Sequence, residues 1–413
     1  MRIHDNIHQY IDLDPIASSI IDTHVFQRLR YIHQTGVLYL VFPTATHSRF
    51  EHSVGTYHLG KMMIQSIRTK QPELGITDEM VMLVSIAGLC HDLGHLLFSH
   101  LFDDCFLEQL PNFEEIKLMT TNYIHENRSI FLLHYIVEQY KVALDKDQLK
   151  VIGDLINPKN SEYNKWKPKY KIGQWIFQII SNPLNSIDVD KFDYLTRDTM
   201  AVGLKIGFDF SRIISDARVI NNIICYSMQC SEDIYHMFFL RYRLHKQIYN
   251  HKAVKAIEIS IIKLLFEMEK EMKISEYIYD PEKMLSLVDS LIMQQNHSII
   301  RNINMRKLPK LVYQDISTNA CTIDENKLAE TFNKDSYHIM RFKVGYVGGK
   351  KNPLNLITFY NSKTGEIIPD NNAKNFSLLI NQKHQEHILR VYCLDLSLID
   401  KFKEYFNYED TSL

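Results

Sequence analysis

The sequence is poor in the two residues that interrupt regular structure. Glycine and proline account for only 14 and 11 of its 413 residues, which excludes collagen-like, linker-rich and largely disordered proteins. An excess of one charge is also missing, because 47 basic and 49 acidic residues leave a net charge of −2. A chain so close to neutrality has no overall field that attracts nucleic acid or an acidic membrane, although a local basic pocket is compatible with it.

Long apolar runs and secretion signals are missing as well. The longest apolar stretch, Met80 to Cys90, has eleven residues and is too short to span a bilayer. The start of the chain has no charged segment followed by an apolar one, so we expect a soluble intracellular protein, cytoplasmic or nuclear. The six cysteines form no Cys-x-x-Cys pair, and in an intracellular chain we expect them to be reduced.

Apolar residues and histidines are what the sequence has in quantity. Hydrophobic residues make up 45% of the chain, enough for the substantial core of a globular protein. Of the 19 histidines, 12 fall within the first 134 residues. Because imidazole binds metals and exchanges protons near neutral pH, this clustering indicates a metal or acid–base site.

Helical periodicity dominates from about residue 15 to 300, and the pattern then changes to short β-rich segments. We therefore predict a mainly α protein, with a helical catalytic core over residues 1–300, an irregular connector over 301–336 and a small α+β lobe over 337–413. Helices are predicted from Asp22-Thr23 through Ile32 and over 52–68, 78–90, 127–139, 187–197, 234–269 and 281–293. Strands are predicted over 338–346, 356–360 and 387–393.

A His-Asp dipeptide follows the most apolar of these helices. The chain has two such pairs, His4-Asp5 and His91-Asp92, where about one is expected by chance. His91-Asp92 stands at the end of the buried helix 78–90, with His95 one turn further on. Placing such groups there is costly unless they are paired or bind a metal. From the residues alone, a metal site and a hydrogen-bonded core role both stay open.

Other polar residues repeat at helical spacing. His52 stands near a predicted helix start, in Arg-Phe-Glu-His-Ser. Two later helices carry polar stripes spaced i, i+4, i+8, which suit a polar pocket better than an apolar core; a solvated surface is the alternative. The stripes are Asp190, Tyr194 and Asp198, and Arg241, His245 and Tyr249.

Together these residues resemble a known family. His52, His91-Asp92 and Asp190 fit the H…HD…D pattern of the HD-domain phosphohydrolases. Longer stretches are similar to the animal SAM-and-HD-domain deoxynucleoside triphosphate triphosphohydrolases, from residue 3 to about 405. That similarity begins with the HD portion, so we expect no SAM domain. The matching stretches are 22–23, 26–31, 41–43, 49–53, 86–95, 98–100, 187–194, 249, 251–252, 351–353 and 390–393.

The resemblance implies an HD-domain helical core and a metal-dependent hydrolysis of dNTPs to deoxynucleoside and tripolyphosphate. The metal ligands would be His52, His91, Asp92 and Asp190. Such mixed nitrogen and oxygen ligation suits a divalent transition metal, namely Fe, Mn, Zn or Ni. A second ion, Mg²⁺, would bind the substrate phosphates.

The resemblance also implies roles for residues around the metal. Among the catalytic residues, His100 would donate a proton to the leaving group, Asp103 and His125 would form its relay, and His95 would touch the α-phosphate. The substrate-binding residues fall into three sets. The triphosphate-binding positions are matched by Arg49, Lys191 and Arg241. The sugar positions are matched by Gln34, Tyr194, Asp198 and Tyr249, with Tyr249 against the 2′ side. His245 would lie near the base.

An activator site is implied as well. Asp22, Gln27 and Arg30 match guanine-reading positions, and Arg218 matches a basic position nearby, so we expect GTP or dGTP as an activator and a homo-oligomer, dimer or tetramer. The chain departs from the family at several positions around its activator sites and beside the sugar, which weakens the second activator site above all. These departures are Met1, His4, Thr35, Ser227 and Gln229.

Two other functions are weighed against this one. An HD-type nucleotidase or phosphodiesterase acting on another nucleotide would release orthophosphate or a monoester, and would not need three cations for a long phosphate tail. A nucleic-acid-binding regulatory module is the non-enzymatic alternative, but the four metal-ligand positions are all occupied and the net charge of −2 provides no attraction for a polyanion. The sequence therefore leaves nucleic acid possible as a partner without indicating it, and we expect no membrane partner.

Overall fold

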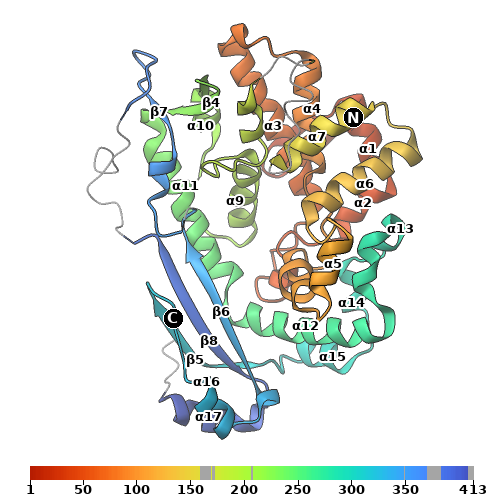
Figure 1. Ribbon diagram of the computed structural model, residues 1–413, viewed down its shortest axis with the longest axis vertical. Coiled ribbons are helices and arrows are strands. Elements are labelled where there is room, and N and C mark those ends of the chain that lie inside the picture. The colour runs from red at the N-terminus through yellow and green to blue at the C-terminus, as the bar shows by residue number, and fades with distance from the viewer. Residues whose placement is uncertain (159–168, 170–172, 206–207, 348, 370–382, 408–413) are drawn as a thin grey trace.

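A computed structural model describes residues 1–158, 169, 173–205, 208–347, 349–369 and 383–407. The chain forms a large helical body, with a three-stranded sheet beside it and two helices at the lower end of that sheet (Figure 1). This architecture confirms the mainly α prediction with a small α+β lobe. The described helices are α1 Pro15–Ile21, α2 His24–Gln27, α3 Arg49–Lys70, α4 Asp78–Cys90, α5 Phe113–Met119, α6 His125–Tyr140, α7 Lys146–Ile156, α9 Val189–Ala201, α10 Ser211–Asp216, α11 Ser231–Arg243, α12 Lys252–Met272, α13 Pro281–Met284, α14 Asp289–Met293, α15 Ser298–Asn304, α16 Glu325–Thr331 and α17 Ile399–Phe406.

Helices α3 and α4 pack against each other within the helical body. Helix α4 has the predicted bounds and is buried almost all round from Met80 to Cys90, as its uniform apolarity requires. Its start is fixed by Thr77, whose hydroxyl accepts the backbone N–H of Met80. Helix α3 starts with a capping box between Ser48 and Glu51, which places His52 in its first turn.

Three helices that were predicted as continuous are interrupted in the structure. The segment after Thr23 forms only the short α2, followed by a 3₁₀ turn, η1 (Arg28–Tyr31). The predicted helix 234–269 is α11, a π-helical turn η9 (Leu244–Tyr249) and α12, broken where the Asn250 side chain bonds the His245 carbonyl oxygen. The predicted helix 281–293 is α13 and α14. Periodicity continues through these breaks because each segment still buries one apolar face.

The break before α14 has a structural consequence. It places Asp289 at the start of the helix, where its buried carboxylate accepts the backbone N–H groups of His33 at 2.9 Å and Phe98 at 2.6 Å. The two segments lie against each other and both line the cavity described below, through Gln34 and Phe98. A continuous helix would carry Asp289 in its interior and leave both loops without this anchor.

The sheet of the lobe has the order β5-β8-β6 and is antiparallel throughout, built from β5 (Lys310–Ser317), β8 (Gln385–Cys393) and β6 (Tyr337–Gly345). Its registers pair Gln314 with Arg390 and Met340 with Arg390. The strands predicted over 338–346 and 387–393 are confirmed within two residues. A small second core, which includes Phe332 and Phe402, joins the sheet to α16 and α17.

The segment 301–336 is not irregular as predicted, because it contains β5 and α16. The alternation in Lys310–Ser317 is weak, since only one of these eight residues is fully buried. The division of the chain at residues 300 and 337 stays a prediction. The strand predicted over 356–360 is reduced to β7 (Phe359–Tyr360), which pairs in parallel with β4 (Ile223–Ser227); β4 also pairs with β3 (Arg218–Ile220).

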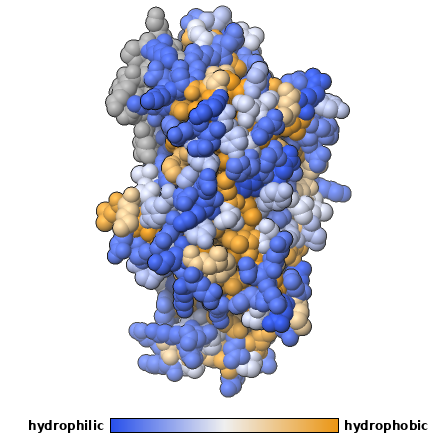
Figure 2. Space-filling model, turned by 90° about the vertical axis from the view of Figure 1, so that its right-hand side faces the viewer, coloured by the Kyte–Doolittle hydropathy of each residue, from blue (hydrophilic) through white to orange (hydrophobic). Residues whose placement is uncertain are grey.

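The chain begins with a hairpin of β1 (Arg2–Asp5) and β2 (Gln9–Asp12). In the residues that the structure describes, no helix combines the length and apolarity needed to cross a bilayer. On the face shown in Figure 2, apolar residues are interspersed with hydrophilic ones.

Candidate active site and metal centre

A cavity of about 550 Å³ opens among α3, α4, α6, α9 and the η9–α12 junction. It brings together 14 of the 16 residues predicted as ligands, catalytic residues or substrate contacts. The other two, His52 and Asp103, are buried behind its wall. The 14 residues are Gln34, Arg49, His91, Asp92, His95, His100, His125, Asp190, Lys191, Tyr194, Asp198, Arg241, His245 and Tyr249.

The four predicted metal ligands converge. Nε2 of His52 lies 3.1 Å from Oδ1 of Asp190, and Nε2 of His91 lies 3.5 Å from the same oxygen. Asp92 completes the group, with Oδ2 at 3.4 Å from His52 Nε2 and Oδ1 at 3.3 Å from His91 Nε2. The atoms of His52, His91 and Asp190 lie close enough to hold one metal ion.

The donor atoms of this group fit a cation. The Nδ1 atoms donate elsewhere, His52 to Asp193 at 2.8 Å and His91 to the Gly88 carbonyl oxygen at 2.8 Å. Each Nε2 is buried and has no hydrogen-bond partner. A metal-binding histidine has this pattern, because the second ring nitrogen fixes the ring while the first presents its lone pair.

The carboxylates of this group require a positive charge nearby to balance their own. Burial disfavours a charged imidazole, but the neighbouring carboxylates Asp190 and Asp193 outweigh that effect and raise the pKa of His52 to about 10. Despite burial, the two imidazoles hold the pKa of Asp190 well below its usual range. Either protons or a metal ion would therefore balance these carboxylates.

A second group lies beside the first. Asp92, His95 and His125 also come close enough for a metal, and the Arg49 guanidinium contacts Oδ2 of Asp92, the oxygen that faces His52. Arg49 also donates from Nε to Ser99 Oγ at 3.0 Å.

The three histidines among the predicted catalytic residues pack ring against ring. His100 packs edge-on against His95, with centroids 5.0 Å apart, and against His125 at 5.5 Å. Desolvation in the cavity and the nearby His125 lower the pKa of His100 to about 4. For His125, the nearby carboxylates of Asp103 and Glu126 outweigh burial and raise the pKa. Asp103 is anchored in turn by Arg128.

The three predicted phosphate-binding cations occupy the cavity wall. Lys191 lies 3.1 Å from Asp188, whose charge, despite burial, raises the pKa of Lys191. Arg241 donates to the Gly345 carbonyl oxygen at 3.0 Å, and its buried Nε has no hydrogen-bond partner. With Arg49, these side chains line the same cavity as His91, Asp92 and Asp190.

Two of the predicted sugar residues, Tyr249 and Asp198, are held by hydrogen bonds. The Tyr249 hydroxyl donates to Asp198, and His47 Nε2 lies 2.7 Å from the other Asp198 oxygen. Sequence reasoning missed His47, which has no partner at helical spacing. It also gave no role to Asp193 or Ser99, although both belong to recognised stretches.

The predicted activator residues are only partly brought together. Asp22, Gln27 and Arg30 line a separate hollow of about 330 Å³, together with Met1 and His4. Arg218 does not line this hollow. Its guanidinium lies over the Tyr360 ring, 5.8 Å from the ring centre, and its part in an activator site stays a prediction.

Comparison with known proteins supports the resemblance. The HD domain family matches residues 49–198. The chain is 35% identical over 410 residues to the deoxynucleoside triphosphate triphosphohydrolase SAMHD1 homolog of Dictyostelium discoideum, covering 95% of this chain and 77% of that protein. It is 31% identical over 460 residues to human SAMHD1, covering 98% and 72%. It is 32% identical over 451 residues to the putative HD domain-containing protein L394 of Acanthamoeba polyphaga mimivirus, covering 97% and 95%. Since these matches extend over nearly the whole chain, it belongs to the HD-domain phosphohydrolase family that includes the deoxynucleoside triphosphate triphosphohydrolase SAMHD1.

Proposed function

We propose that this protein hydrolyses deoxynucleoside triphosphates to deoxynucleoside and tripolyphosphate in a metal-dependent reaction. The observation that carries the proposal is the composition of one cavity. It joins a buried His/Asp group that demands a cation, three basic side chains and a polar pocket made by Tyr249 and Asp198. The relatives named as deoxynucleoside triphosphate triphosphohydrolases support the substrate class.

His52, His91, Asp92 and Asp190 would hold a divalent transition metal, because two imidazoles and two carboxylates suit Fe, Mn, Zn or Ni. When bound, such an ion supplies Lewis-acid charge for hydrolysis at the α-phosphorus. Mg²⁺ is proposed on the substrate phosphates, where hard oxygen ligands dominate.

Other residues would bind the triphosphate and move a proton. Arg49, Lys191 and Arg241 would offset the charge of the phosphate tail. The 5′-oxygen is a poor leaving group, so a donor is needed, and His100 is our candidate. His100 would take its proton from His125, whose ring packs against it and whose Nδ1 faces Asp103. His95 would contact the α-phosphate.

Selection of deoxyribose is assigned to Tyr249. Because its hydroxyl is bonded to Asp198 and Asp198 is held by His47, the ring has a fixed position in the cavity wall. With its ring fixed against the 2′ carbon of the bound sugar, Tyr249 would exclude a 2′-hydroxyl sterically. Gln34 and Tyr194 would complete the sugar pocket, and His245 would lie near the base.

Activation by a guanine nucleotide is a further part of the proposal. The hollow beside Asp22, Gln27 and Arg30 supports it, and the family resemblance implies that the activator promotes a dimer or tetramer. Hydrolysis of dTTP with and without GTP tests the activator, with light scattering of the same samples for the assembly. Equal rates in both samples would remove the activator from the proposal.

Product analysis tests the reaction itself. A panel of dNTPs and NTPs is incubated with Mg²⁺ plus Mn²⁺ or Fe²⁺, and the products are resolved by mass. Tripolyphosphate and deoxynucleoside in equal amounts are expected. Orthophosphate or a nucleoside monophosphate would favour the nucleotidase or phosphodiesterase alternative, and single-strand binding without turnover would favour the nucleic-acid module.

A further inference from the structure

His52 depends on a second carboxylate that is not a proposed ligand. Its Nδ1 lies 2.8 Å from Oδ2 of Asp193, and both side chains are fully buried. Both oxygens of Asp193 pair with the guanidinium of Arg197, as those of an ionised carboxylate do. An ionised carboxylate only accepts, so His52 Nδ1 must be the donor and Nε2 faces the metal ligands.

Asp193 is itself held by three partners from other positions. Arg197, one turn later on α9, donates Nε to Oδ2 and Nη2 to Oδ1, both at 2.9 Å. His8 donates Nε2 to Oδ1 at 2.7 Å. With His52, these bonds occupy both oxygens of Asp193 and leave it no freedom to rotate.

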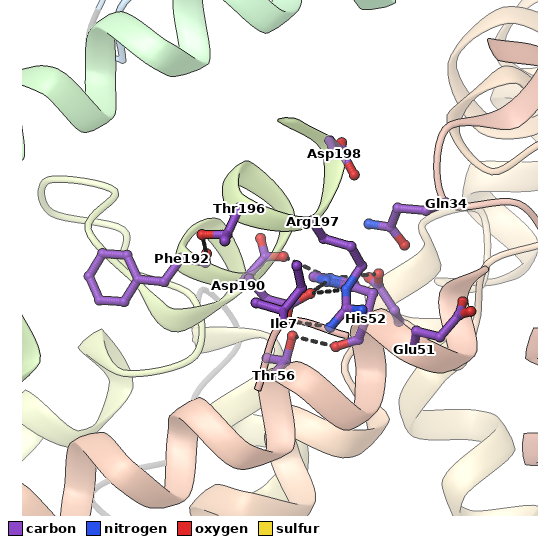
Figure 3. A network of polar contacts seen from close by, with 12 residues as sticks. Ile7, Gln34, Glu51, His52, Thr56, Asp190, Phe192, Thr196, Arg197 and Asp198 are labelled. Atoms are coloured by element: carbon purple, nitrogen blue, oxygen red, sulfur yellow. Dashed lines mark hydrogen bonds and ion pairs between the residues drawn. The ribbon is translucent and has the colours of Figure 1, made fainter. Parts of the chain in front are cut away.

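Arg197 and His8 connect Asp193 to the N-terminal hairpin. Arg197 donates its remaining nitrogen, Nη1, to Oδ2 of Asp5 at 2.8 Å. The other oxygen of Asp5 accepts the backbone N–H groups of Ile7 and His8, both at 2.8 Å. Figure 3 shows the turn at Ile7, Arg197 of α9 and His52 of α3 converging from three separate elements.

The backbone of α3 makes room for this group. A Cβ atom at Gly55 would lie 1.9 Å from Oδ1 of Asp193 and 2.7 Å from Nη2 of Arg197. Any side chain at Gly55 would therefore displace the buried pair. The glycine stands three residues after His52, on the helix that carries the ligand.

We infer that Asp5 and His8, in the turn of the N-terminal hairpin, are positioning residues for the metal ligand His52 and act through Arg197 and Asp193. The inference rests on the proposed metal-dependent function, since it concerns the same site. Residues outside the matched HD domain, which begins at residue 49, thus contribute to metal affinity. Partners that orient a metal-binding histidine typically change affinity by about 10- to 100-fold when they are removed.

Mn²⁺ binding to the full-length protein tests the inference without turnover. Free Mn²⁺ is measured by electron paramagnetic resonance during titration of metal-depleted protein. His8→Ala is expected to raise the Kd by about 10-fold or more. His8→Gln keeps an N–H donor and is expected to restore most of the affinity. Asp12→Asn is the matched control, because it breaks an exposed ion pair with Arg2 at the other end of the same hairpin.

The outcomes separate this inference from the proposed function. If the unaltered protein binds no Mn²⁺, Zn²⁺ or Fe²⁺, the proposed function fails. If it binds Mn²⁺ and His8→Ala binds equally well, or if His8→Gln binds as poorly as His8→Ala, the positioning role is wrong. Should His8→Ala not fold, Asp5→Asn takes its place, with weaker binding than Asp12→Asn expected and equal binding overturning the inference.

Discussion

The imidazole rings of His95 and His125 stack nearly parallel, with their centroids 4.1 Å apart and 19° between their planes. On its other side, His125 Nδ1 faces Asp103 Oδ2 at 3.5 Å. That oxygen is buried and has no hydrogen-bond partner. A buried carboxylate is thus connected to the cavity through imidazole rings that lie outside the proposed metal ligand set.

This arrangement predicts the effect of His125→Ala. The variant should slow turnover by about 100-fold or more, the usual scale of lost proton-transfer catalysis, because His100 loses its proton source. Its metal content should stay that of the unaltered protein. Turnover and metal analysis on the same preparation check this. Loss of metal would instead place an ion in the group of Asp92, His95 and His125.

Removal of a proposed metal ligand should eliminate the bound metal as well as the turnover. His91→Ala and Asp190→Ala should abolish measurable turnover together with bound transition metal, since each leaves the remaining ligands with an incomplete donor set. His134→Ala, on the exposed side of α6, is the control and should change neither. Normal metal content in both ligand variants would contradict the proposed site.

Gly94→Ala should disturb the site through the backbone. A Cβ there would lie 2.2 Å from the His125 carbonyl oxygen and 2.4 Å from the Ser129 nitrogen, so α6 has to move. We expect the free energy of unfolding to fall by about 1–3 kcal/mol, the usual cost of overpacking. Gly153→Ala in α7, whose Cβ would meet nothing closer than 3.5 Å, should instead be neutral or stabilising. Urea denaturation of both variants decides it, and equal stabilities would contradict the prediction.

Tyr249→Ala should weaken the discrimination between dNTP and NTP. Loss of the ring that faces the 2′ carbon is expected to lower the ratio of the two kcat/KM values by about 10-fold. Tyr249→Phe keeps the ring and loses only the bond to Asp198, so its ratio should change less. The ratios are measured with dTTP and UTP under identical metal conditions. An unchanged ratio in Tyr249→Ala would remove this residue from sugar selection.

The lowered pKa of His58 predicts that the stability of the fold depends on pH. Burial, with a smaller contribution from His8, lowers its pKa from the usual 6.5 to about 4. Because the unfolded chain binds this proton more readily, folding loses stability as the pH falls from about 6.5 towards 4. His58→Gln should therefore lose less stability between pH 7 and pH 5 than the unaltered protein. Thermal unfolding at the two pH values checks it, and an equal loss in both proteins would contradict the assignment.

How much could be predicted from the sequence differs between residues. Helix α4 was predictable to its last residue, because its almost uniformly apolar stretch from Met80 to Cys90 has to be buried and gives way to the polar His-Asp pair at its end. The strand β5 was not, since its pairing with β8, from Gln314 to Arg390, joins residues that no local pattern connects. The π-helical turn at Leu244–Tyr249 was hidden by the same spacing that identified Arg241, His245 and Tyr249.

The candidate site divides in the same way. The sequence by itself determined which chemical groups are present, the helix that carries His91-Asp92 to its end, and the family to which the pattern belongs, because these depend on residue type and short spacing. Only the tertiary structure decided that His52 faces Asp190 with Nε2 and Asp193 with Nδ1, that Asp103 lies behind the cavity, and that Arg218 stands apart from Asp22. These features depend on how distant segments pack, and packing is the sum of many contacts whose partners local sequence does not specify.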